Sequence, residues 1–129
     1  MTRYLLDTCT FIWLCARPEE LSATAREAID AADSSLLLSD VTALEITLKW
    51  RAGKIELPDP PRRWIEDQAA SWALDFRPLT RSEIYAAGEL PRYHHDPFDL
   101  LLIATAINLD ATILTPDSAI HKYPVSYRW

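Results

Sequence analysis

Glycine is scarce in this chain, since only Gly53 and Gly88 occur among 129 residues. Phosphate-binding loops of nucleotide enzymes need several glycines at fixed spacings, so this scarcity nearly excludes them. Neither a Ser-His-Asp spacing of a nucleophilic triad nor a dinucleotide fingerprint is present. The chain also lacks internal repeats, low-complexity tracts and a plausible linker. Together with its length, this predicts a single domain over residues 1–129.

Long apolar runs and secretory features are absent as well. No apolar stretch approaches the ~20 residues that a membrane-spanning helix needs. The start Met1-Thr2-Arg3 leads into a strand-like segment without a cleavable signal pattern. The two cysteines, Cys9 and Cys15, lack the C-x-x-C spacing of metal sites. We therefore expect reduced, buried thiols in a cytoplasmic protein that does not contact a membrane.

A basic surface of the kind that nucleic-acid binders display is not evident from the net charge of −6. This argues only weakly against a nucleic-acid partner, because several of the negative charges belong to the site predicted below. Bound divalent cations would locally invert the sign there. Basic residues cluster at Lys49, Arg51 and Lys54 and again at Arg62-Arg63. A solvated face is the simpler explanation of these clusters.

Strand-like and helix-like segments alternate along the chain. Apolar segments bounded by turn residues predict strands at 3–6, 35–39, 75–79, 112–115 and 125–127. Apolar periodicity and capping residues predict helices at 8–15, 22–33, 41–52, 62–72, 80–89 and 97–109, with a helical turn at 118–122. Such alternation predicts an α/β fold with parallel strands and helices on both faces of the sheet.

Four acidic residues occur where a strand has just ended or a helix passes the sheet edge. They are Asp7, Glu45, Asp99 and Asp117. The carboxyl ends of parallel strands share one edge of an open sheet, and binding sites form in the crevice there. We therefore expect the four carboxylates to converge on one pocket.

Asp7 and Asp117 also have simpler explanations when each is taken alone. Asp7 closes the apolar strand and could serve as the N-cap of the helix that begins near Thr8. Asp117 follows Thr115-Pro116 and could be a turn acid or the cap of the turn at 118–122. The case for a site depends on the four acids together.

Glu45 is harder to explain structurally. It shares one helical stripe with apolar Val41, Leu44 and Leu48, where a buried acid needs a partner. The alternative is a glutamate at the edge of this stripe that reaches solvent or Lys49.

The segment Asp96-Pro97-Phe98-Asp99 has the pattern of a helix start, with an acid at the N-cap and proline at the first helical position. We assign Asp96 to the cap. Asp99 is the better site candidate, because it begins the most apolar helix. For the three histidines, exposed or hydrogen-bonding roles are expected rather than metal binding; they are His94, His95 and His121.

Electrostatics indicates what such a pocket would hold. Two carboxylates about 4 Å apart repel by roughly 4 kcal/mol at an effective dielectric constant near 20, so a cluster binds protons or a metal. Ligand sets made only of oxygen favour Mg²⁺ or Mn²⁺ over Zn²⁺. A cation held by carboxylates suits phosphodiester hydrolysis, because it supplies a nucleophile and neutralises charge on the transition state.

An ordered set of motifs resembles the PIN domain, and specifically the VapC-type toxins of bacterial toxin–antitoxin pairs. The resemblance spans essentially the whole chain. Each motif alone is weak, but the set with His-x-Asp-Pro-Phe-Asp in it is specific. The matching segments are Tyr4-Leu5-Leu6-Asp7-Thr8, Ser39 and Thr42 before Glu45-Ile46, His94-His95-Asp96-Pro97-Phe98-Asp99 with Leu102-Ile103-Ala104, Leu114-Thr115-Pro116-Asp117 and the closing segment to Trp129.

The resemblance implies a three-layer α/β/α fold with a central, mainly parallel sheet and a Mg²⁺- or Mn²⁺-dependent endoribonuclease. According to this resemblance, the family's metal-binding acids correspond to Asp7, Glu45, Asp99 and Asp117. It further implies a cognate antitoxin as partner, a homodimer, and a structured RNA such as transfer RNA as substrate.

Two positions depart from the family pattern. Leu100 stands where many relatives carry arginine, which removes a possible phosphate contact, and Cys9 stands where many have histidine or serine. Neither departure removes a carboxylate. Two other functions stay open at this point: a catalytically silent PIN-fold binding module, and a metal-dependent phosphatase or DNA nuclease.

Overall fold

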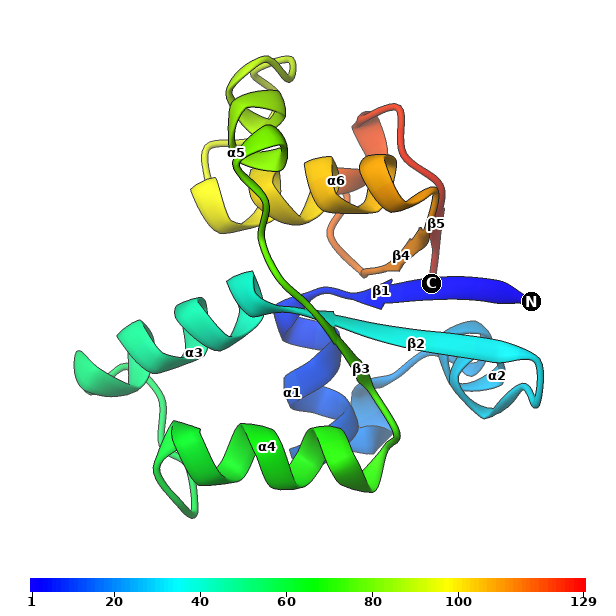
Figure 1. Cartoon of the computed structure of the whole chain (residues 1–129). Coiled ribbons are helices and arrows are strands. Elements are labelled where there is room, and N and C mark those ends of the chain that lie inside the picture. The colour runs from blue at the N-terminus through cyan, green and yellow to red at the C-terminus, as the bar shows by residue number, and fades with distance from the viewer.

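A computed structural model describes all residues from Met1 to Trp129. Its core is a sheet of five strands, all parallel, in the order β3-β2-β1-β4-β5 (Figure 1). The strands are β1 (Thr2–Leu6), β2 (Ser34–Ser39), β3 (Asp75–Arg77), β4 (Thr112–Leu114) and β5 (Tyr127–Arg128). The predicted parallel sheet is thus confirmed, with the first strand at its centre.

Helices cover both faces of this sheet. They are α1 (Thr8–Ala16), α2 (Ala23–Asp30), α3 (Asp40–Arg51), α4 (Pro61–Ser71), α5 (Arg81–Gly88) and α6 (Pro97–Leu109), with short 3-10 turns at Pro18–Glu20 and Ile120–Lys122. In Figure 1, α1, α2 and α4 lie on one side of the sheet, while α5 and α6 lie on the other. This arrangement confirms the three-layer α/β/α fold. No helix is both long and apolar enough to cross a bilayer.

Each face of the sheet packs against its own apolar core. Side chains alternate between the faces of a strand, and accordingly Leu6 and Leu38 belong to the cluster that contains Phe11 of α1. Leu5 and Leu37 instead belong to the cluster under α6. All four leucines are fully buried, so β1 and β2 form the middle of both cores. The two strands therefore hold their carboxyl ends in a fixed position.

Side-chain caps decide where several helices begin. The Ser22 hydroxyl accepts from the Ala25 N–H at 3.0 Å, and the Ser39 hydroxyl accepts from the Val41 N–H at 3.0 Å. Thr80 forms a full capping box with Glu83. Such caps satisfy backbone donors that have no partner within the helix. The sequence did not predict the capping box.

The structure corrects several predicted boundaries. The helix predicted at 22–33 ends at Asp30, because the chain turns into extended backbone at Ala31. The strand predicted at 75–79 stops at Arg77, directly before Pro78, which has no N–H to donate. The last strand is Tyr127–Arg128 rather than 125–127, since its register is set by pairing with β4.

The cysteine prediction is half right. Both Cys9 and Cys15 are free thiols, as expected, but both are partly exposed rather than buried. Cys9 is one of the residues that line the cavity described below. Burial raises the pKa of Cys9 to about 11, with a further contribution from nearby carboxylates, so the side chain stays a protonated thiol.

Candidate metal centre

The carboxyl ends of β1 and β4 bring together residues from opposite ends of the chain. Asp7 directly follows β1, is only 4% exposed, and accepts the Thr10 N–H at 2.8 Å through Oδ1 as the N-cap of α1. The Thr10 hydroxyl donates to the Leu114 carbonyl of β4 at 2.8 Å. Asp7 is therefore a helix cap and also a buried acid at the sheet edge, so the two sequence-based explanations are compatible.

Glu45 on α3 is a buried carboxylate with one unsatisfied oxygen. The residue is 4% exposed, and its Oε2 is paired with the ammonium of Lys49. Its Oε1 has no hydrogen-bond partner. Burial and a contact with Lys49, which the sequence left as alternatives, occur together in the structure.

A second buried glutamate shows that burial alone does not mark a site. Glu83 is 2% exposed, but both of its oxygens are satisfied. Oε1 accepts from the Thr80 N–H at 2.8 Å, and Oε2 accepts from the Asn108 amide at 3.0 Å. A buried acceptor left without a partner costs about 1–3 kcal/mol. Glu45, unlike Glu83, therefore has an oxygen available for a ligand.

Asp99 and Asp117 are bridged by a histidine. The Nε2 atom of His94 lies 2.7 Å from Asp99 Oδ2 and 3.1 Å from Asp117 Oδ2. Asp99 lies in the first turn of α6, whose N-cap is Asp96, with Oδ1 accepting from the Phe98 N–H at 2.9 Å. Asp96 therefore caps α6, as predicted.

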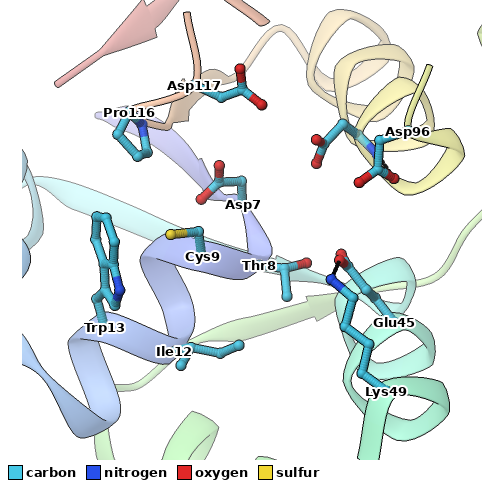
Figure 2. Close-up of a pocket in the computed structure, with 11 residues that line it drawn as sticks. Asp7, Thr8, Cys9, Ile12, Trp13, Glu45, Lys49, Asp96, Pro116 and Asp117 are labelled. Carbon is cyan, nitrogen blue, oxygen red and sulfur yellow. Dashed lines mark hydrogen bonds and ion pairs between the residues drawn. The ribbon is translucent and has the colours of Figure 1, made fainter. Parts of the chain in front are cut away.

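All four predicted acids line one cavity of about 370 Å³. Figure 2 shows the carboxylates of Asp7, Glu45 and Asp117, together with that of Asp96, arranged around this space. The lining residues are Asp7, Thr8, Cys9, Ile12, Trp13, Glu45, Lys49, Asp96, Asp99, Pro116 and Asp117. The expected convergence on one pocket therefore occurs.

The four acids are not equally close to one another. The tightest group of possible ligands is His94, Asp99 and Asp117, whose ligating atoms lie within 4.8 Å of one another. Asp7 and Glu45 line the same cavity outside that group. His94 forms hydrogen bonds, as expected, but its place between Asp99 and Asp117 was not predicted. In the sequence, the one indication of this contact is that His94 lies five residues before Asp99.

The side chains of the other two histidines form no hydrogen bond with the four acids. His121 Nε2 contacts the Thr115 carbonyl at 2.8 Å, and its ring stacks on Tyr127 with centroids 3.8 Å apart. His95 is exposed. Leu100 packs against the apolar cluster under α6 and adds no charge to the cavity.

Crowding of buried acids changes their proton affinity. Burial raises the pKa of Asp7, and hydrogen bonds from Thr10 offset only part of this rise. Burial and the neighbouring charge of Asp96 raise the pKa of Asp99 to about 7. Burial works against the charged form of His94, but its hydrogen bond to Asp99 and the charges of Asp99 and Asp117 leave its pKa raised. Asp7, Asp99 and His94 therefore hold their protons more strongly than the same side chains do in solution.

The donor set fits a hard divalent cation. Carboxylate oxygens are the ligands that Mg²⁺ and Mn²⁺ prefer. Glu45, whose Oε1 has no partner, lines a cavity whose other carboxylates already need compensating charge. Such a site can bind a cation that in turn binds an anionic substrate.

Comparison with known proteins agrees with this geometry. The PIN domain family matches residues 4–125. Over 127 residues, the chain is 31% identical to Ribonuclease VapC22 of Mycobacterium tuberculosis, covering 96% of this chain and 95% of that protein.

Two solved structures share the fold at low identity. VapBC2 from Rickettsia felis, bound to a DNA fragment from its promoter, has a TM-score of 0.74 at 16% identity over 98% of each chain. VapBC-1 from nontypeable Haemophilus influenzae has a TM-score of 0.63 at 15% identity, over 98% of this chain and 97% of that one. With the family match over nearly the whole length, this chain belongs to the PIN-domain family and, within it, to the VapC type.

Proposed function

We propose that this chain is a metal-dependent endoribonuclease that acts as the toxin of a toxin–antitoxin pair. The observation that carries the proposal is Glu45 Oε1, a buried carboxylate oxygen without a partner, in a cavity lined by four further carboxylates. The identity to Ribonuclease VapC22 supports RNA as the substrate. From the family resemblance, transfer RNA is the RNA class proposed.

A Mg²⁺ or Mn²⁺ ion would be held in this cavity by Asp7, Glu45, Asp99 and Asp117. When bound, such an ion supplies charge neutralisation and a water of lowered pKa for phosphodiester hydrolysis. The Thr10 N–H orients Asp7 by fixing its Oδ1. His94 Nε2 keeps a proton between Asp99 and Asp117, which limits their mutual repulsion. The chain thus arranges the negative charge before any cation or substrate is bound.

Incubation of purified protein with total RNA tests this function. We expect cleavage in Mn²⁺ or Mg²⁺ and none in chelator, because the carboxylates cannot approach a phosphate without a compensating cation. Sequencing the new RNA ends identifies the RNA class, and ends outside transfer RNA would contradict that part of the proposal. Cleavage of DNA or of a phosphomonoester in place of RNA would support the alternative enzymes, and no turnover at all would support a silent binding module.

A cognate antitoxin is the proposed protein partner, since structural neighbours are described as VapBC complexes. An acidic cavity attracts lysine or arginine side chains, so we expect the antitoxin to place a basic residue there. Co-expression of the adjacent small gene should restore growth, and its product should co-purify with this chain. The partner proposal fails if no adjacent gene product restores growth or co-purifies.

We also propose that the chain forms a homodimer. Light scattering of the purified chain tests this, and a monomer mass would contradict it.

A further inference from the structure

Lys49 is the one basic residue that lines the acidic cavity. It lies on α3, one helical turn after Glu45, among five carboxylates. Figure 2 shows its side chain extending along α3 so that the ammonium meets the carboxylate of Glu45 beside Thr8. The Lys49 side chain is 42% exposed and that of Glu45 only 5%, so the ammonium lies at the rim with its acid beneath it.

The ammonium has donors left over in this position. A lysine ammonium has three N–H donors, and the one hydrogen bond that Lys49 makes is to Glu45 Oε2. The other two donors have no hydrogen-bond partner within the protein. The hydrogen bond to Glu45 raises the pKa of Lys49, and the charges of Glu45, Asp96 and Asp99 add to this rise. The residue is therefore a fixed positive charge with unused hydrogen-bonding capacity at the cavity mouth.

An ordinary helix-surface ion pair does not account for this arrangement. Glu and Lys four residues apart on an exposed face form pairs in which both side chains are solvated. Here the acid is buried, has a second oxygen without a partner, and lies inside a cavity. Glu45 can therefore hold the ammonium through Oε2 while Oε1 stays available to a cation.

We propose that Lys49 binds a phosphate of the substrate at the cavity mouth, with Glu45 holding its ammonium in place. The inference rests on the proposed function, because it names the residue that overcomes the repulsion between an anionic substrate and an acidic site. A phosphate that enters the cavity meets five carboxylates and one ammonium. Lys49 attracts this phosphate from the rim, and a charge-assisted hydrogen bond to it is about twice as strong as a neutral one.

The test measures binding of a fluorescein-labelled, cleavage-resistant 2′-O-methyl phosphorothioate oligonucleotide by anisotropy in saturating Mn²⁺. Lys49→Gln removes the charge but keeps an amide donor for Glu45, so the buried acid retains a partner. We expect about 10-fold weaker binding at about 0.1 M salt, and a salt slope reduced by about 0.7 for one lost phosphate contact. Lys49→Arg should bind within about twofold of wild type, because it keeps the charge.

Lys54→Gln is the matched control, since Lys54 is exposed beyond the end of α3 and does not line the cavity. It should bind the oligonucleotide nearly as wild type does. A second readout is the rise in melting temperature caused by Mn²⁺. For Lys49→Gln this rise should equal or exceed that of wild type, because a positive charge beside the cation has been removed.

Two results would overturn the inference alone while wild type still cleaves RNA. One is equal oligonucleotide binding by Lys49→Gln and Lys54→Gln. The other is a parallel loss of oligonucleotide binding and of the Mn²⁺ shift in Lys49→Gln, which would mean that Lys49 only holds Glu45 in place. A wild-type protein that neither binds the oligonucleotide nor cleaves RNA would overturn the proposed function and this inference with it.

Discussion

Asp7→Asn is expected to lower RNA cleavage by about 10³-fold or more while the protein stays folded. A metal ion stabilises the transition state of phosphodiester hydrolysis by several kcal/mol, and losing that stabilisation slows the reaction by a factor of this size. The fold should persist because asparagine is as good an N-cap as aspartate, and its Oδ1 can still accept the Thr10 N–H. The substitution also removes the cost of burying a charge at a residue that is 4% exposed.

Single-turnover cleavage of the preferred RNA measures this loss, with circular dichroism as the check on folding. Asp33→Asn is the matched control, because Asp33 is exposed and directly precedes β2, at the opposite end of the strands from the cavity. In cells, wild type should arrest growth when expressed without its partner, and Asp7→Asn should not. A folded Asp7→Asn protein that remained fully toxic would rule out a catalytic role for this carboxylate.

The second large effect concerns stability without metal. The pKa of Asp99 in the folded protein is raised to about 7 from 3.8. The folded protein therefore favours the protonated form of Asp99. The stability that this proton provides is fully present below about pH 4 and is lost as pH rises through about 7. The raised pKa values of Asp7 and His94 act in the same direction. We expect the metal-free protein to become less stable over this range by about 1–3 kcal/mol.

Asp99→Asn should consequently melt at a higher temperature than wild type in chelator at pH 8, even though it removes activity. At pH 5 the two should differ little, because Asp99 is then protonated. Mn²⁺ should stabilise wild type by RT ln(1 + [M]/Kd), about 2.7 kcal/mol at a hundredfold excess over Kd, and the variant much less. Thermal melts with chelator and with metal measure both effects. Equal metal shifts in the two proteins, or a less stable variant in chelator at pH 8, would show that Asp99 does not share a metal site.

The sequence predicted the sheet edge well because that edge depends on local signals. Strand ends are marked by apolar runs that stop at Asp7 and before Asp117, and parallel pairing follows from the alternation of strands and helices. The capping role of Asp96 could also be read locally, since Asp-Pro at a helix start has a specific stereochemistry. These features fix which acids line the cavity.

Contacts between distant segments could not be predicted in this way. The bridge from His94 to Asp117 spans 23 residues, and it depends on how the loop before α6 packs against the turn after β4. The two buried glutamates are another example, because both look like acids on amphipathic helices. Only the folded structure shows that Asn108 satisfies Glu83 while nothing satisfies Glu45 Oε1. Which carboxylate is available for a ligand is therefore a tertiary property.

The place of β1 between β2 and β4 has a consequence for synthesis. Asp7 is synthesised long before β4, which pairs with β1 through Leu6 and Leu114. The cavity cannot close until β4 has left the ribosome, and contacts of such long sequence separation form slowly. We therefore expect the proposed cleavage of RNA to begin only after β4 has joined the sheet and brought Asp117 to the cavity.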